Sequence, residues 1–204
     1  TVSVYADKAI DNGYIEGSLT YGINDNTTSR IVNTAGLNRA YTAAYDSSQL
    51  SLKISAGSPT EVSADTYITP FGSFTSSSIT TDSYTEKSVT ASDNLRLKVD
   101  QDDVSSMIGT IGIKAHKVTD QGTPMISLAI NNEFGDTKIK STNTYQGGGS
   151  AFKTTTDIEA LSATLGLGYS FGSEMTSLNI SYETEWNDED YTSTYGSIKI
   201  TSKF

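Results

Sequence analysis

Ser170 and His116 are the residues of this chain most able to support catalysis. Ser170 is the central residue of Gly168-Tyr-Ser-Phe-Gly172, which matches the G-x-S-x-G pattern of serine hydrolases. That chemistry needs the nucleophile on a strand-to-helix turn beside a base, and His116 is the single histidine. The residues after Gly172 predict a hairpin turn instead. We therefore interpret the match as a chance occurrence, His116 as a solvated polar residue, and the chain as a non-enzymatic protein.

Two acidic runs, Asp100-Gln-Asp-Asp103 and Asn187-Asp-Glu-Asp190, could bind a cation. Neither run has the ligand spacing of a calcium-binding loop, so solvated loops are the simpler interpretation. The single histidine and the absence of cysteine argue against a catalytic zinc site and exclude a disulfide framework. No phosphate-binding loop or dinucleotide fingerprint is present. We predict no cofactor and no metal.

The composition argues against nucleic acid as a partner. The 204 residues carry a net charge of −10, whereas a phosphate backbone requires clustered lysine and arginine. The length suits one sizeable domain. No apolar run approaches the ~18 residues of a membrane-spanning helix. A membrane-spanning strand needs only ~10 residues of alternating character, so a β-barrel in a membrane remains compatible with this sequence.

The last ten residues, 195–204, predict a strand with two unlike faces, because successive side chains of a strand point to opposite sides. The face that is largely apolar carries Gly196, Ile198, Ile200, Ser202 and Phe204. The polar and cationic face carries Tyr195, Ser197, Lys199, Thr201 and Lys203. The strand ends on an aromatic side chain, as expected where a strand reaches a membrane interface.

Eight further segments alternate in the same way, which gives about nine strands. They lie near residues 1–9, 14–24, 40–57, 66–79, 105–117, 125–135, 161–171 and 178–186. Short and long connections alternate between them, as in outer-membrane barrels. The short ones lie near 10–13, 58–64, 119–122 and 172–174, and the long ones near 25–39, 80–103 and 136–157. An all-β, antiparallel transmembrane β-barrel is therefore the expected fold.

The polar faces of these strands also carry charges that a soluble core would not bury unpaired. We expect these side chains to face a water-filled lumen: Glu16, Lys53, Lys114, His116, Glu133, Glu183, Glu185, Lys199 and Lys203. A soluble β-sandwich with the charges in solvent remains an alternative. An odd count of nine does not close a single-chain bacterial barrel, which has an even strand number. The count is either wrong by one, or further strands lie upstream of Thr1.

Several short segments, in this order and spacing, resemble the carboxyl-terminal translocator barrel of bacterial autotransporters. They are the strand 13–22 followed by Asn24 and Arg30, Ile68-Thr-Pro-Phe-Gly-Ser-Phe74 followed by Tyr84 and Glu86, Ile111-Gly-Ile-Lys114, Glu133-Phe-Gly-Asp136, Leu165-Gly-Leu-Gly168, Tyr182, and the closing segment 191–204. Phe71 replaces the family's usual tyrosine, Lys114 its arginine, and Ser202 its large residue two positions before the end.

The resemblance implies a twelve-stranded barrel in the bacterial outer membrane, of which residues 1–204 would be the carboxyl-terminal portion. The remaining strands and an amino-terminal passenger domain would lie upstream. The implied function is to anchor the passenger and help carry it to the cell surface. Gly196, Ile198, Ile200 and Phe204 would then form the signal read by the barrel-assembly machinery. A small complete outer-membrane barrel acting as adhesin or pore remains the alternative.

Overall fold

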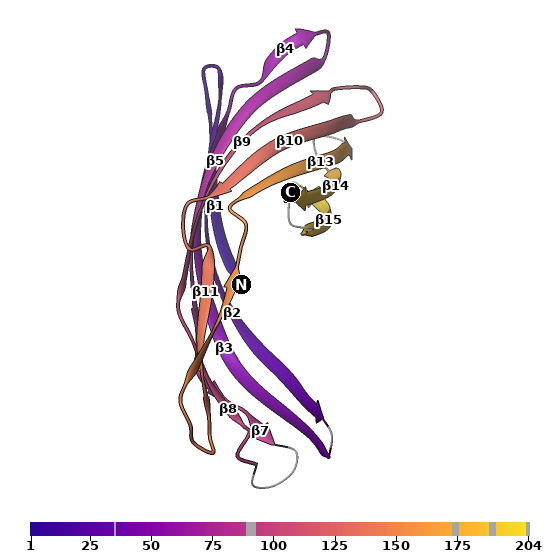
Figure 1. The fold of residues 1–204 in the computed structure, drawn as a ribbon. Helices are drawn as coiled ribbons and strands as arrows, with labels where there is room; N and C mark the ends of the chain where they lie inside the picture. The colour runs from indigo at the N-terminus through magenta and orange to yellow at the C-terminus, as the bar shows by residue number, and fades with distance from the viewer. Residues whose placement is uncertain (35, 89–92, 173–175, 188–190, 203–204) are drawn as a thin grey trace.

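The computed structural model describes residues 1–204 except residues 35, 89–92, 173–175, 188–190 and 203–204 (Figure 1). The described residues form strands and turns, and none of them belongs to a helix. A helix long and apolar enough to cross a membrane is accordingly not found among them. The strands are β1 (Val2–Ile10), β2 (Gly13–Thr34), β3 (Leu37–Gly57), β4 (Thr60–Ser63), β5 (Thr66–Thr81), β6 (Tyr84–Thr85), β7 (Lys87–Ser88), β8 (Leu97–Gln101), β9 (Val104–Lys117), β10 (Thr123–Glu133), β11 (Lys138–Tyr145), β12 (Phe152–Asp157), β13 (Leu161–Gly172), β14 (Thr176–Trp186) and β15 (Thr192–Ser202).

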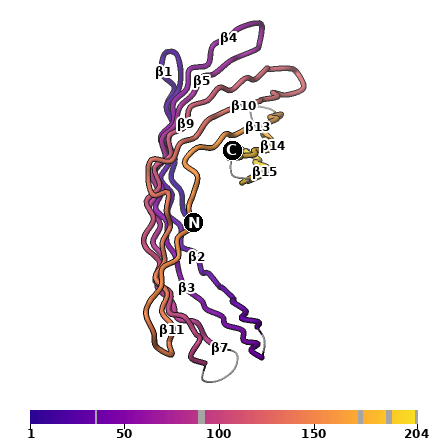
Figure 2. Tube along the Cα trace, in the orientation of Figure 1, coloured from indigo at the N-terminus to yellow at the C-terminus, as the bar shows by residue number. Residues whose placement is uncertain are grey.

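One large antiparallel sheet contains most of the chain. Its strand order is β1-β2-β3-β5-β9-β10-β13-β14-β15, so strands that follow one another in the sequence lie side by side. The predicted all-β antiparallel fold is confirmed, and this path has the predicted number of nine strands. Two short strands bring the sheet to eleven, because β4 pairs with β5 and β7 pairs with β3. The sheet is bowed, with a concave and a convex face (Figures 1 and 2). Within the described residues β1 and β15 are its two edges and do not pair with each other.

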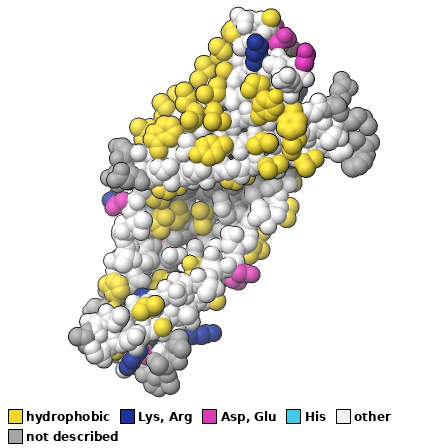
Figure 3. Space-filling model, turned by 90° about the vertical axis from the view of Figure 1, so that its right-hand side faces the viewer, with side chains coloured by type: hydrophobic (Ala, Val, Ile, Leu, Met, Phe, Trp, Pro, Cys, Tyr) yellow, Lys and Arg dark blue, Asp and Glu magenta, His cyan; other side chains and the backbone are white. Residues whose placement is uncertain are grey.

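The convex face is apolar because the hydrophobic side chains of neighbouring strands are in register. Leu128 of β10 lies opposite Ile113 of β9 on one side and opposite Leu165 of β13 on the other. Leu128 and Ile113 are about half exposed, as are similar residues along the other strands. Hydrophobic side chains gather over the upper half of the molecule in Figure 3, and most of the visible charges lie toward its two ends. A soluble β-sandwich would bury such a face, so that alternative is wrong.

The two ends of the large sheet differ. At one end, which we call the turn end, strands are joined at residues 11–12, 58–59 and 118–122. At the opposite end, the loop end, β5 leads to β9 through residues 82–103 and β10 leads to β13 through residues 134–160. At these positions the alternation of short and long connections follows the predicted pattern, and the predicted long connection at residues 25–39 is the exception.

The predicted connection at residues 25–39 is wrong, because this segment continues the β2/β3 hairpin. The pairing runs without a register shift from Tyr14 and Gly57 to Thr34 and Leu37. The part beyond Asn24 is rich in threonine, isoleucine and valine, which favour strands. It lies beyond the apolar band of the sheet, so its two faces differ little in polarity. The alternation that predicts a strand from the sequence is therefore weak there.

The two longer predicted connections, 80–103 and 136–157, contain a second sheet. Its order is β12-β11-β8-β6, and we call it the small sheet. The hydrophobic residues that are buried among the described residues lie in this sheet or in β3, namely Leu97, Val99, Tyr41 and Ala43. The loop end therefore contains the packed core of the molecule, while the apolar residues of the large sheet stay exposed.

Candidate functional site

Three of the charged residues predicted to face a lumen lie around one cavity on the concave face. Glu16 of β2, Lys53 of β3 and Lys199 of β15 line a cavity of about 350 Å³, together with Asp7 of β1. The Ser55 hydroxyl donates a hydrogen bond to Oε2 of Glu16 at 3.1 Å. Lys199 comes from the opposite edge of the sheet, so the curvature brings residues from both edges to the same polar space.

The two predicted positions on β9, Lys114 and His116, contact aromatic side chains of β5. The Lys114 ammonium lies 5.9 Å from the ring centre of Phe71, within the range of a cation–π interaction. His116 stacks on Tyr67 with ring centres 5.0 Å apart and an interplanar angle of 11°. Each pair joins β5 and β9, so these polar residues cross-link neighbouring strands as well as line the concave face.

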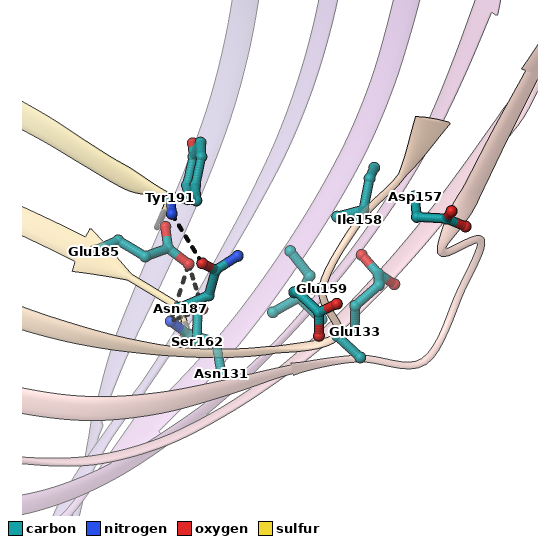
Figure 4. Close-up of a pocket in the computed structure, with 11 residues that line it drawn as sticks. Asn131, Glu133, Asp157, Ile158, Glu159, Ser162, Glu185, Asn187 and Tyr191 are labelled. Carbon is teal, nitrogen blue, oxygen red and sulfur yellow. Dashed lines mark hydrogen bonds between the residues drawn. The ribbon is translucent and has the colours of Figure 1, made fainter. Parts of the chain in front are cut away.

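Glu185 of β14 belongs to a hydrogen-bonded network that joins four strands. The Ser162 hydroxyl donates to its Oε1 (Figure 4). The Asn131 amide donates to Thr164 Oγ1 at 2.8 Å. The Thr110 hydroxyl donates to Oδ1 of Asn131 at 2.9 Å. Asn131 is therefore a central residue of the polar wall that sequence reasoning missed. Its place on the polar face of β10, opposite Ser162, was the signal available in the sequence.

Glu133, also predicted to face the lumen, fixes the corner where β10 leaves the large sheet. Its Oε1 accepts hydrogen bonds from the backbone amides of Met107 at 2.6 Å and Gly135 at 2.7 Å, and Ser106 donates to Oε2. Asp136 accepts a further bond from a neighbouring amide of β9 at 2.7 Å. The carboxylates of Glu133 and Asp136 thus hold this segment against the start of β9 by hydrogen bonds.

The mouth of the concave face, near the loop end, is acidic. A cavity of about 460 Å³ is lined by Glu133, Glu185, Asp157 and Glu159, among other residues (Figure 4). Asp157 comes from the small sheet, whereas Glu185 comes from the large one. No group of three or more histidine, cysteine or carboxylate side chains is placed to hold a metal ion within the described parts of the chain.

The last predicted charge on β14, Glu183, lies opposite Tyr195 of β15.

Three residues of the predicted assembly signal lie on the convex face of the terminal strand. Ile198 and Ile200 lie opposite Ile180 and Leu178 on the convex face and are 73% and 72% exposed. Gly196 lies opposite Tyr182 on that face. Lys203 and Phe204 lie outside the described residues. A central strand of the sheet has a paired strand on each side. Within the described residues β15 pairs with β14 alone, so its isoleucines have hydrophobic neighbours on one side only.

Ser170 lies within β13, which pairs antiparallel with β14. Gly168–Gly172 is therefore part of a strand hairpin, in contrast to the strand-to-helix elbow of serine hydrolases. Ser170 pairs with Thr123 and Asn179, whereas His116 stacks on Tyr67. The two residues do not form the hydrogen-bonded pair that nucleophilic catalysis requires.

A partly buried ionic cluster, which we call the latch, joins the β2/β3 hairpin to Glu86 and Asp93. The Arg30 guanidinium donates two hydrogen bonds to the Glu86 carboxylate, from Nε at 2.7 Å and from a terminal nitrogen at 2.6 Å. Tyr41 donates to Oδ2 of Asp93 at 2.7 Å, and Arg39 lies 3.2 Å from the same oxygen. The Arg30 guanidinium also lies 4.3 Å from the ring centre of Tyr41. Both carboxylates are buried, yet each has an arginine partner.

Within the latch, each shifted pKa favours the protonation state that forms the hydrogen bond. The hydrogen bond from Tyr41, supported by the amide of Leu95, lowers the pKa of Asp93. Burial, followed by the bond to Asp93, raises the pKa of Tyr41, and the hydrogen bond to Glu86 raises the pKa of Arg30. Asp93 therefore stays ionised and Tyr41 stays neutral across the neutral pH range. Sequence reasoning missed this pairing, because it joins residues more than fifty positions apart.

Comparison with known proteins identifies both a matching family and a similar structure. The family model described as "Autotransporter beta-domain" matches residues 1–183. The fold is similar to the translocator domain of the autotransporter NalP from Neisseria meningitidis, with a TM-score of 0.73 and 17% sequence identity. That match covers 99% of this chain and 65% of the NalP chain, so the present chain spans less than two thirds of it. No curated protein is detectably similar in sequence.

Proposed function

The chain belongs to the autotransporter β-domain family, and from this premise we propose that it carries an amino-terminal passenger domain to the cell surface and anchors it there. A β-domain of this family resides in the bacterial outer membrane. The concave face provides the polar wall that a translocating polypeptide meets, and the convex face meets lipid. The charges Glu16, Lys53 and Lys199 belong to that wall, as do the remaining charges of the concave face.

The observation that carries this proposal is the inverted distribution of side chains. Aliphatic residues such as Leu52, Ile111 and Ile126 are exposed on the convex face, while charged residues line cavities on the concave face. A protein in water would do the reverse, because exposed apolar surface is unfavourable there. In a bilayer the arrangement is stable, since lipid covers the apolar face and every strand except an edge is paired.

We also propose that the nine strands are the carboxyl-terminal part of a larger barrel. Support comes from the two unpaired edges, β1 and β15, because an open sheet edge is not tolerated in lipid. The longer NalP translocator domain is consistent with additional strands. The additional strands and the passenger would precede β1 in the full-length protein.

Export can be tested by adding protease to intact cells that express the full-length protein with an epitope in its passenger. We expect the epitope to be digested in intact cells, and the turn-end residues 118–122 to be cut only after the outer membrane is opened. An epitope that stays protected in intact cells, although the barrel is present in the outer membrane, would contradict passenger export.

Phe204→Ala in the full-length protein should lower the outer-membrane level several-fold. The final strand must first pair with a foreign sheet edge, and its alternate side chains would give that pairing specificity. The barrels that do form should keep near-normal thermal stability, because the ladder hydrogen bonds of β14 and β15 remain. Quantitative blotting of outer-membrane fractions measures the level, with Lys203→Ala as the control expected to assemble normally. Equal levels of both variants and wild type would remove Phe204 from the proposed signal.

A further inference from the structure

The small sheet continues the wall of the large sheet at the loop end, so it has an inner and an outer face (Figure 1). Tyr84 of β6 stacks on Tyr45 of β3 with ring centres 4.5 Å apart. Tyr45 shares the concave face with Ser55, which lines the polar cavity, because the two residues lie an even number of positions apart in one strand. Tyr84 therefore faces inward, and the next residue, Thr85, faces outward.

The register of the small sheet carries this assignment from strand to strand. Thr85 lies opposite Lys98 of β8, and Lys98 lies opposite Thr144 of β11. Alternation along β11 places Lys140 on the same face as Thr144, and pairing with β12 extends that face to Lys153. These three lysines, from three neighbouring strands, thus project from the outer face of the wall.

The outer face of the small sheet is basic, although the chain as a whole carries a net charge of −10. Five exposed lysines lie on it or on the adjoining β7, and we call them the basic patch: Lys87, Lys98, Lys138, Lys140 and Lys153. Lys138 forms an ion pair with Asp157 at 2.9 Å. The ion pairs found among the described residues do not include the other four lysines. Asp100 shares this face and Asp102 directly follows β8, so the lysines still outnumber the carboxylates.

Threonine hydroxyls lie beside the lysines of the basic patch. The opposite pairs are Lys98 with Thr85 and Thr144, Lys140 with Thr155, and Lys153 with Thr142. The Cβ atoms of directly opposite residues lie about 4.5–5.5 Å apart. An ammonium group and a hydroxyl group can therefore donate hydrogen bonds to the same anion. Phosphate oxygens suit such donors, because they are charged and accept several hydrogen bonds at once.

The basic patch is continuous with the hydrophobic convex face of the large sheet. Phe134 follows β10 and is 64% exposed. A Cβ added to Gly109 would lie 2.8 Å from its ring, and Gly109 pairs with Phe74 of the convex face. Lys138 comes four positions after Phe134 in the chain. Apolar surface is thus followed directly by basic surface, in the order in which a lipid presents its acyl chains and its headgroup.

We propose that the basic patch binds the phosphate groups of anionic lipids in the outer leaflet of the membrane. The leaflet rests on the proposed function, which turns the loop end toward the cell exterior. Charge complementarity favours a phosphorylated partner, and the adjoining apolar face favours one with acyl chains. The inner mouth at this end is lined by carboxylates such as Glu133 and Glu159, so the attraction is confined to the outer face.

Binding of lipid A, a phosphorylated glycolipid of the outer leaflet, to the folded full-length protein in detergent tests this proposal. The combined change Lys98→Gln, Lys140→Gln and Lys153→Gln should weaken the affinity roughly a hundredfold, because each lysine near an anionic lipid surface contributes a factor of about five. Arginine at the same three positions should preserve it, since a guanidinium also binds phosphate. The affinity is read from the rise, with lipid concentration, of the temperature at which the folded band disappears on a gel.

Lys8→Gln with Lys117→Gln is the matched control. Lys8 lies opposite Ile15 and Lys117 opposite Thr66, which places both lysines on the convex face near the turn end. Their strands, β1 and β9, are not neighbours, so the two lysines do not form a patch. This variant should bind lipid A as wild type does. A loss as large as that of the triple glutamine variant would overturn the proposal, as would an unchanged affinity in the triple variant itself.

Two further measurements separate a lipid from other partners and the basic patch from the proposed function. The phosphorylated disaccharide of lipid A without its acyl chains should bind much more weakly than lipid A, and equal affinity would contradict a lipid as the partner. Passenger display is scored on intact cells. A wild-type protein that displays its passenger but has no affinity for lipid A contradicts the patch alone, whereas absence of display contradicts the proposed function.

Discussion

Ile54→Arg should sharply lower the amount of assembled barrel, whereas Ser55→Arg should leave it close to wild type. Ile54 is 50% exposed on the convex face, opposite Gly17 of β2 and Phe74 of β5. An arginine on the lipid face of a membrane barrel costs about 2–4 kcal/mol near the bilayer midplane. That cost applies to the folded barrel alone, because the unassembled chain keeps the guanidinium in water.

Ser55 is the matched control, since it is the next residue of the same strand and points to the concave face. Its hydroxyl already lies 3.1 Å from the Glu16 carboxylate, so an arginine there gains an opposite charge in a wet cavity. Heat-modifiable gel mobility of outer-membrane fractions measures the assembled barrel in both cases. Equal assembly of the two variants would show that the assignment of the convex face to lipid is wrong.

Gly135→Ala should destabilise the assembled barrel, because there is no space for a Cβ at this corner. An added Cβ would overlap the backbone oxygen of Ser105 and would lie 2.8 Å from Oε1 of Glu133 and 2.9 Å from the amide nitrogen of Met107. Overpacking of this kind typically costs about 1–3 kcal/mol. The atoms that must move include the Glu133 carboxylate and its backbone partners. The hydrogen bonds that Glu133 accepts from the amides of Met107 and Gly135 are therefore lost as well.

Gly17→Ala is the control for this prediction. A Cβ at Gly17 has its nearest neighbour at 3.9 Å, an ordinary van der Waals distance. The temperature at which the folded band disappears on a gel should fall for Gly135→Ala and stay constant for Gly17→Ala. Parallel behaviour of the two variants would mean that the Glu133–Asp136 corner does not limit stability.

The period of two along the strands was sufficient to predict much of the architecture. Leu161, Leu165 and Phe171 alternate with small or polar residues, and β13 covers the predicted strand closely. The same alternation separates Lys53 from Ile54 and thus assigns charges to one face of the sheet. Such patterns are local, because neighbouring side chains of a strand point to opposite sides whatever the rest of the chain does.

The strands of the loop end were harder to predict, because apolar and polar side chains do not alternate clearly along them. Residues 25–34 extend β2 although the weak contrast between their two faces suggested a loop, and β11 and β12 lie within a segment that was predicted to be a loop. Their pairing is stabilised by threonine-rich ladders and by contacts across the chain. A sequence pattern that compares only adjacent residues does not detect such contacts.

The sequence by itself determined the antiparallel sheet, its nine strands and the separation of an apolar from a charged face, because each follows from the order of residues within single strands. Only the tertiary structure decided which charges act together. Arg30 and Glu86 are separated by 56 residues, and Glu16 and Lys199 come from strands at opposite parts of the sheet. The curvature of the large sheet and the pairing of β7 with β3 bring these groups together, and both depend on contacts between strands that are distant in the sequence.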